Sequence, residues 1–334
     1  MPDGFSLLLI VVVVLAVVFD YINGFHDTAN AIATSVSTRA LRPSHAILMS
    51  ATANFVGALS GTAVANTIAS GLARTPSGDP GQVIVAAALM GAIAWNLLTW
   101  RLGIPSSSSH ALIGGLIGAV IAASGPDALN MQGIFDKVLF PLVASPILGV
   151  VLGFTLMVVL LNVFRNAHPR RLNDRFRRLQ VLSAAYMAFS HGSNDAQKTM
   201  GIITLALVAG GVLAEPTVPL WVIVLAASAI SLGTAAGGWR IIKTMGQRVV
   251  KLDPVHGFAA ETTAATIIFG ASHFGMPVST THVISSAIIG VGSSDRLSAV
   301  RWGVAGNIVI AWVLTIPASG TVAWLAWEVL SRVL

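Results

Sequence analysis

Long, uninterrupted apolar stretches restrict this chain to very few folds. Hydrophobic residues make up 55% of its 334 residues and charged residues only 10%, with a mean hydropathy of +0.81. A soluble domain could not bury so much apolar surface in one core, whereas a helix that crosses a bilayer needs about 20 such residues. A transmembrane β-barrel would show alternation in segments of about ten residues, but these stretches are continuous. The sequence therefore predicts an all-α, polytopic membrane protein.

Ten apolar segments are expected to form the membrane helices. The stretch 5–19 lacks a basic region before it and a cleavage site after it, so we assign it to the first helix and not to a signal peptide. The ten segments are 5–38, 44–72, 82–101, 106–124, 137–164, 180–213, 218–239, 257–274, 278–292 and 300–330.

The basic residues predict how the chain is oriented in the cell membrane. We treat segments 82–101 with 106–124, and 257–274 with 278–292, as two re-entrant helical hairpins. Fourteen of the nineteen Lys and Arg residues then lie in cytoplasmic loops and three outside, which is a strong positive-inside bias. Both termini are accordingly predicted to lie outside, with the basic loop 165–179 in the cytoplasm. Because the basic residues are scattered through short loops, a nucleic-acid partner is not expected.

Two pairs of related motifs indicate an internal repeat. Asn23-Gly-Phe-His-Asp-Thr-Ala-Asn30 pairs with His191-Gly-Ser-Asn-Asp-Ala-Gln-Lys198, and their aspartates lie 168 residues apart. Leu102-Gly-Ile-Pro-Ser-Ser-Ser-Ser-His110 pairs with Phe274-Gly-Met-Pro-Val-Ser-Thr-Thr-His282, at an offset of 172 residues. Similar offsets in the same order indicate a duplicated unit, with a first repeat at 1–164, a connector at 165–179 and a second repeat at 180–334. Each unit has an odd number of segments, so we expect inverted-topology repeats with broken helices, the architecture of many secondary transporters.

The second motif pair predicts an anion site. Gly-x-Pro ends a helix, so the hydroxyl residues that follow it should occupy the N-cap and first turn of a new helix. Two such helix ends that meet from opposite sides offer N–H groups, hydroxyls and partial positive charge to an oxyanion. The alternative is that these residues only cap ordinary helices. The candidate anion-binding residues are Ser106, Ser107, Ser108, Ser109, Ser279, Thr280 and Thr281.

The first motif pair predicts a cation or proton site. A carboxylate inside a membrane costs about 2.5 to 3.5 kcal/mol, and the flanking Gly24 and Gly192 favour unwinding that would expose backbone carbonyls. Asp27 and Asn30 offer the hard oxygen ligands that small cations prefer. Lys198 stands where the first copy has Asn30, and its ammonium is expected to neutralise Asp195 in place of a coupling ion. A buried pair that merely joins two helices is the alternative.

Histidine and asparagine exchange places between the two polar motifs. His26 corresponds to Asn194, and His191 corresponds to Asn23. Because histidine titrates near neutral pH, His26 and His191 are candidates for a proton relay. The alternative is that backbone carbonyls satisfy each buried imidazole.

The polar motifs resemble the paired signatures of the inorganic phosphate transporter (PiT) family, whose general form is Gly-Ala-Asn-Asp-Val-Ala-Asn-Ala, and in particular its bacterial low-affinity branch. The resemblance implies import of inorganic phosphate by symport with a cation, by alternating access, in a homodimer without a cofactor. By position, Asp27, Asn30 and Asp195 fall on the family's cation-binding residues. The hydroxyl residues of the Pro-Ser/Thr-His elements fall on its phosphate-binding tips.

Departures from the signature bear on the coupling ion. His26 replaces the signature Asn, and Gln197 and Lys198 replace Ala-Asn. The branch that is similar in these substitutions is associated with protons and with metal-phosphate complexes, so we expect protons instead of sodium and phosphate with or without a divalent metal. If sodium is the coupling ion, Asp27, Asn30 and Asp195 are the expected ligands.

Two different functions would also suit these residues. Another tetrahedral oxyanion such as sulfate would need the same hydroxyl and N–H donors. A membrane-embedded phosphohydrolase that uses Asp27 and Asp195 with a metal is more remote, because the sequence has no metal-site motif such as His-Glu-x-x-His.

Overall fold

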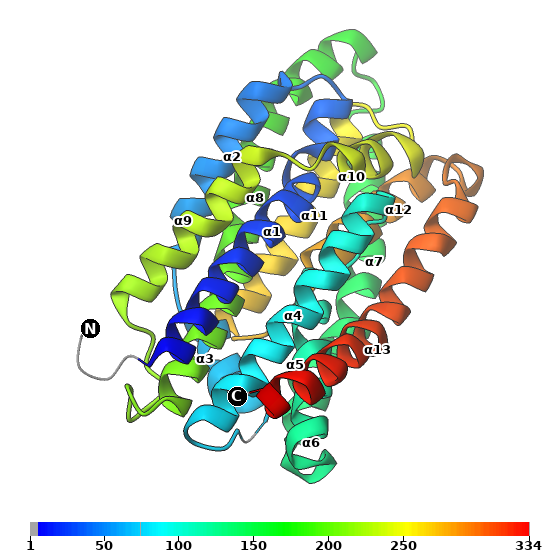
Figure 1. Cartoon of the computed structure of the whole chain (residues 1–334). Coiled ribbons are helices and arrows are strands. Elements are labelled where there is room, and N and C mark those ends of the chain that lie inside the picture. The colour runs from blue at the N-terminus through cyan, green and yellow to red at the C-terminus, as the bar shows by residue number, and fades with distance from the viewer. Residues whose placement is uncertain (1–5, 74, 334) are drawn as a thin grey trace.

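The computed structural model describes residues 6–73 and 75–333, which form a bundle of helices (Figure 1). Over these residues the only β-type pairing is one isolated bridge between Ala73 and Leu129. The α-helices are α1 (Leu7–Ser37), α2 (Pro43–Ala58), α3 (Ala63–Gly71), α4 (Asp79–Leu102), α5 (Ser108–Ser124), α6 (Met131–Ile134), α7 (Phe140–Val163), α8 (Pro169–Ala209), α9 (Leu220–Ala236), α10 (Trp239–Lys243), α11 (Pro254–His273), α12 (Thr280–Asp295) and α13 (Trp302–Val333). Short 3-10 or π turns, η1 (Pro126–Ala128), η2 (Phe135–Leu139), η3 (Thr244–Arg248) and η4 (Leu297–Ala299), join some of them.

Helix length and apolarity agree with a multi-pass membrane protein. Four described helical segments are long and apolar enough to cross a bilayer, or six if each bent pair counts as one span. Helices α8 and α11 are not among them because polar residues are frequent along them. Many of those polar residues are buried, so both helices lie inside the bundle and turn polar faces toward other helices.

The same succession of elements occurs twice along the chain. A long helix (α1 or α8) is followed by a bent pair, α2 with α3 at 66° or α9 with α10 at 61°. A hairpin (α4 with α5, or α11 with α12) and another long helix (α7 or α13) complete each half. The halves exchange partners reciprocally, since α9 packs on α1 as α2 packs on α8, and α5 packs on α13 as α12 packs on α7.

The two motif helices, α1 and α8, run in opposite directions where they meet. Thr38, at the end of α1, donates a hydrogen bond of 2.7 Å to Gln180 near the start of α8. Further back along α1, Asp27 faces Asp195, which lies further along α8. As residue numbers fall on α1 they rise on α8, so these equivalent helices of the two halves are antiparallel.

The predicted unwinding at Gly24 and Gly192 is wrong. Helices α1 and α8 continue through both glycines without interruption. A Cβ at Gly24 would lie 2.3 Å from the Ile230 carbonyl oxygen, and one at Gly192 would lie 2.2 Å from the Asn54 carbonyl oxygen. The glycines therefore allow α9 and α2 to approach the motif helices closely, which is the usual role of small residues in membrane helix packing.

Several other predicted boundaries shift for local reasons. The segment 44–72 divides into α2 and α3 at residues 59–62, and the segment 218–239 continues past a bend at Gly237 into α10. The predicted connector 165–179 is helical from Pro169 onward, where proline occupies the first turn of α8. Proline suits that position because the first N–H groups of a helix have no intrahelical partner.

Both hairpins have the tips that Gly-x-Pro predicts. Gly103 ends α4 with φ 69°, and Gly275 follows α11 with φ 66°, a left-handed conformation that glycine adopts easily. Ser107 then caps α5 and Ser279 caps α12, each accepting a hydrogen bond from the N–H three residues later. The predicted helix starts are thereby confirmed.

The far end of the second hairpin is joined by a charged cluster. His256 in the first turn of α11 contacts Asp253 at 2.8 Å and Asp295, at the end of α12, at 2.9 Å. Burial disfavours the imidazolium, but the hydrogen bonds and charges of Asp253 and Asp295 outweigh it and raise the pKa of His256. This contact holds the two legs of the hairpin together away from its tip.

Candidate functional site

Lys198 lies where the motif helix α8 meets both hairpin tips. Its ammonium pairs with Asp195 one turn earlier, as the sequence predicts, and donates to the Ser109 hydroxyl of the first tip. It also donates to the Val278 carbonyl of the second tip at 2.9 Å. The side chain is 1% exposed. One buried cation therefore connects the second motif with both predicted anion-binding elements.

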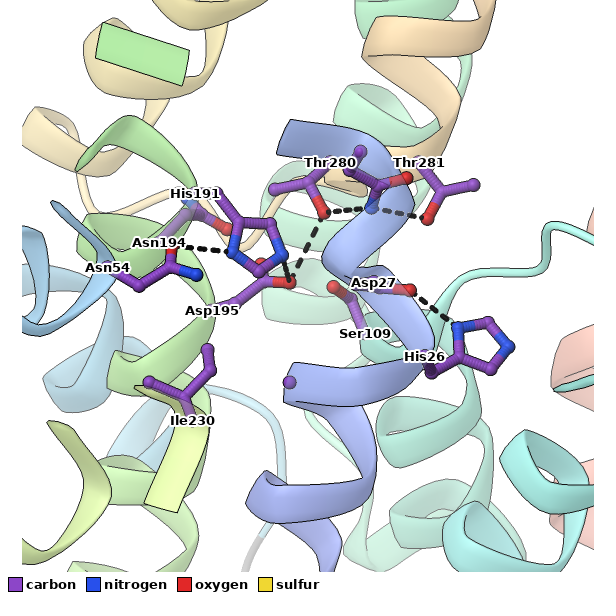
Figure 2. A network of polar contacts seen from close by, with 12 residues as sticks. His26, Asp27, Asn54, Ser109, His191, Asn194, Asp195, Ile230, Thr280 and Thr281 are labelled. Atoms are coloured by element: carbon purple, nitrogen blue, oxygen red, sulfur yellow. Dashed lines mark hydrogen bonds and ion pairs between the residues drawn. The ribbon is translucent and has the colours of Figure 1, made fainter. Parts of the chain in front are cut away.

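Asp195 has further partners besides Lys198 (Figure 2). One of its oxygens lies 3.2 Å from His191 Nε2 and accepts a hydrogen bond of 3.2 Å from the Thr280 hydroxyl. His191 Nδ1 lies 3.0 Å from the side-chain oxygen of Asn54 on α2. These contacts fix the carboxylate between α8 and the second hairpin and leave it little freedom to act as an independent cation ligand.

The first motif divides its contacts between the two hairpins. Asp27 pairs with His26 at 2.6 Å, and the other nitrogen of that imidazole lies 3.1 Å from the Thr99 hydroxyl near the end of α4. Asn30 donates to Thr280 at 3.2 Å and to Thr281 at 2.9 Å. Its side-chain oxygen has no hydrogen-bond partner among the described residues, so this oxygen is available as a ligand.

The tips of the two hairpins lie against each other. Ser109 donates to the Val278 carbonyl at 3.3 Å, and the rings of His110 and His282, in the first turns of α5 and α12, lie 4.6 Å apart between centroids. Ser106 donates to Thr99 at 2.8 Å, whereas the Ser108 hydroxyl has no partner within the described structure. The N-terminal ends of two helices, whose first N–H groups have no intrahelical acceptor, thus meet beside Lys198.

The structure brings together almost all of the predicted site residues. Asp27, His191 and Asp195 place ligand atoms within 4.8 Å of one another. Lys198 contacts Ser109 of the first tip and the Val278 carbonyl of the second, and Thr280 of the second tip contacts Asp195. Asn194 is the exception, because it faces away toward Ser272 and the Met276 carbonyl. Every predicted site residue is at most 2% exposed. The site is therefore closed on both sides in this conformation.

Sequence reasoning missed three polar residues of the site and its surroundings. Asn54 orients His191, Asp20 is a second buried carboxylate on α1, and Glu261 on α11 accepts from residues that include Gln180 at 3.1 Å. The argument that singles out Asp27, a costly carboxylate in an apolar stretch, applies equally to Asp20 and Glu261. Neither Asp20 nor Glu261 lies in a repeated motif, and the prediction of functional carboxylates relied on such repetition.

The candidate ligands suit a cation, but Lys198 already pairs with one of them, Asp195. Two carboxylates and an imidazole are ligands that divalent transition metals accept, and Asn30 adds a free amide oxygen for a hard cation such as sodium. Lys198, however, already neutralises Asp195. The first-motif side, with Asp27 and Asn30, is therefore the better place for a bound cation.

Comparisons with known proteins agree with the geometry. A family model described as the phosphate transporter family matches residues 23–323. The chain is 50% identical to a probable low-affinity inorganic phosphate transporter of Bacillus subtilis over 99% of both chains, and 49% identical to one of Rhizobium meliloti over 96% of both. A solved structure titled "The sodium-dependent phosphate transporter" has a TM-score of 0.91 and 26% identity, covering 98% of this chain and 100% of that one.

Proposed function

This chain belongs to the phosphate transporter family, so it is a transporter and not an enzyme, and we propose that it imports inorganic phosphate across the cell membrane by symport with a cation. The observation that carries the proposal is the meeting of the two capped hairpin tips at Lys198. An oxyanion there would receive N–H groups from two helix ends, hydroxyls such as that of Ser108, and one ammonium. No other described part of the chain combines these donors with the duplicated motifs.

We assign the coupling to protons in preference to sodium. The Lys198 ammonium pairs with Asp195, where a second symmetrical sodium site would need an unpaired carboxylate and an amide. At the first motif, His26 pairs with Asp27 at 2.6 Å, which places a side chain that can accept or donate a proton beside the carboxylate. Sodium coupling through Asp27 and Asn30 is the alternative, and the name of the structural relative favours it.

A divalent metal that travels with phosphate has ligands available next to the tips. Asp27, His191 and Asp195 provide oxygen and nitrogen atoms within 4.8 Å of one another. The metal would be part of the transported substrate, with phosphate oxygens completing its coordination. Competition between the metal and Lys198 for Asp195 would keep its binding reversible.

Alternating access is the mechanism that we infer for the movement. Antiparallel α1 and α8, and the reciprocal packing of the two halves, support an inverted repeat whose two arrangements open the site to opposite sides. The closed site described above then corresponds to an occluded conformation. Assembly as a homodimer remains a prediction from the family resemblance.

Uptake into proteoliposomes tests the function and its coupling. Labelled phosphate should accumulate when the outside is acidic relative to the lumen and should not respond to a sodium gradient at fixed pH. Asp27→Asn is the matched inactive control and should abolish coupled uptake while the protein stays folded. Failure of the wild type to accumulate phosphate under any gradient would refute phosphate symport, and sodium dependence at fixed pH would refute proton coupling.

Sulfate is the competing substrate that the same assay should exclude. A hydroxyl-lined tip cannot by itself distinguish two tetrahedral oxyanions, so we include unlabelled sulfate as a competitor. Unlabelled phosphate should abolish uptake of the label, whereas equal sulfate should leave most of it. Equal inhibition by sulfate would show that the site selects only for shape and charge.

A further inference from the structure

Asp20 is a buried carboxyl group of α1 that the phosphate and cation sites do not use. It lies two turns before Asp27, is 0% exposed, and neither of its oxygens has a hydrogen-bond partner among the described residues. Its neighbours are the side chains of Asn23 on the same helix and Thr199 on α8. Asp27 and Asp195, by contrast, each have a basic partner in His26 and Lys198.

The surroundings of Asp20 suit a protonated carboxyl group. Asp20 is fully buried, and the described residues provide neither a counter-ion nor a hydrogen bond to either of its oxygens. An ionised carboxylate is costly in such a place unless it takes up a proton. The Thr199 hydroxyl also lacks a partner within the described part of the chain, and it could serve a protonated carboxyl group as donor or acceptor.

We propose that Asp20 is the group that binds and releases the coupling proton. The inference rests on the proposed proton symport and names the residue that performs it. The proton joins a carboxylate oxygen of Asp20 while the site is open to the acidic side, and the O–H bond breaks when the site opens to the other side. The proton then leaves to water, and Asp20 returns to its ionised form.

The charges around Asp20 link its protonation to phosphate binding. Asp195 and Lys198 of α8 are the charged groups that lie close enough to interact with it. Helices α9 and α4 also pack on α1. Helix α9 has no titratable side chain, and the charged side chains of α4, Asp79 and Arg101, lie near its two ends. An ionised Asp20 attracts the Lys198 ammonium away from the tips. A protonated Asp20 leaves that ammonium with the tips, where phosphate would bind.

This arrangement makes proton and phosphate binding mutually favourable. Phosphate adds negative charge to a site that already contains Asp27 and Asp195, so neutralising a third carboxylate nearby strengthens its binding. By linkage, bound phosphate must strengthen proton binding at Asp20 by the same factor. Such reciprocity is what couples the two fluxes.

Two transport measurements and one measurement of proton uptake on Asp20→Asn test the proposal. The first is phosphate accumulation driven by an inward pH gradient in proteoliposomes, for which one coupled proton concentrates phosphate up to about tenfold per pH unit. The second is exchange of labelled for unlabelled phosphate with equal pH on both sides, which needs no net proton movement. The variant should lose the gradient-driven accumulation, retain measurable exchange, and take up fewer protons than the wild type when phosphate binds in detergent. Asp20→Glu, which keeps a titratable carboxyl, should recover part of the accumulation.

The outcomes separate this inference from the proposed function. If the wild type is driven by the pH gradient and Asp20→Asn is driven equally well, Asp20 is not the proton carrier, although proton symport stands. If the wild type transports no phosphate, the proposed function itself fails. If both Asp20 variants fail to exchange phosphate although Asp136→Asn, an exposed control, behaves normally, Asp20 is a structural residue and the proposal is overturned.

Discussion

Lys198 contacts Asp195 and both hairpin tips, so one side chain joins three parts of the candidate site. Breaking a buried ion pair by removing one partner typically costs about 3–5 kcal/mol, because the other charge is left uncompensated. The uncompensated Asp195 would then need another cation. In the first motif the corresponding position is Asn30, whose amide oxygen is a cation ligand and not a counter-charge.

Replacement of Lys198 by the residue of the other copy should therefore change the coupling ion. We expect Lys198→Asn either to abolish phosphate uptake or to make it depend on sodium, because sodium would now neutralise Asp195. Uptake is measured in proteoliposomes with and without a sodium gradient, with Lys251→Asn, an exposed lysine outside the site, as the control. Unchanged proton-driven uptake by Lys198→Asn would show that the lysine does not replace a coupling ion.

At the scale of single residues, the sequence predicted partners better than backbone conformation. The Asp195–Lys198 pair follows from helical spacing, and the Ser107 and Ser279 caps follow from the preceding Gly-x-Pro. Gly24 was predicted to unwind its helix, but close approach of Ile230 explains it. Whether a membrane glycine breaks a helix or admits a neighbour depends on tertiary packing, which one sequence does not contain.

Each hairpin tip accepts one hydrogen bond from a hydroxyl in the bent helical segment of the other half of the chain. Thr67 of α3 donates to the Gly275 carbonyl at 2.8 Å, and Thr244 of η3 donates to the Gly103 carbonyl at 2.9 Å. The two contacts correspond to each other in the proposed repeat, and each joins one half of the chain to the other. If alternating access separates one tip at a time from its bent pair, these bonds close the two opposite pathways.

Removing either hydroxyl should open one pathway selectively. A net hydrogen bond contributes about 1 kcal/mol, so Thr67→Val or Thr244→Val should shift the population of the open state about fivefold. The chain has no cysteine, so Ser108→Cys provides a single reporter at the buried site. Thr67→Val should speed its labelling by an impermeant maleimide from the predicted outer side, and Thr244→Val from the inner side. Equal effects of both variants from one side would contradict the assignment.

Elements were predictable where their ends carry a local signal. The Gly-x-Pro tips place both hairpins correctly, whereas the bends of 66° and 61° in the pairs after α1 and α8 were missed. The first bend lies at residues 59–62 and the second at Gly237 and Gly238. Continuous apolar sequence on both sides of a bend resembles a single long span. Hydropathy gives the same value to an apolar residue that faces lipid and to one that faces protein, so it does not reveal the bend.

The direction of the whole bundle in the membrane is still a prediction, and the structure makes it testable. The start of α1 and the end of α13 lie at the same end of the bundle, and the α7–α8 connection lies at the other (Figure 1). The start of α8 carries five arginines, namely Arg170, Arg171, Arg175, Arg177 and Arg178, all of them exposed. Basic residues of this kind are retained in the cytoplasm during insertion, which would leave both termini outside.

Fusions of alkaline phosphatase, which is active only outside the cytoplasm, decide the orientation. A fusion after residue 334 should be active, and an insertion between α7 and α8 at 164–168 should be inactive. A fluorescent protein that matures only in the cytoplasm should give the opposite pattern at the same two sites. The reverse result at both sites would mean that the bundle has the opposite orientation in the membrane. The Thr67 contact would then close the inner pathway and the Thr244 contact the outer one. Equal activity at both sites would contradict the arrangement itself, because the bundle places them at opposite ends.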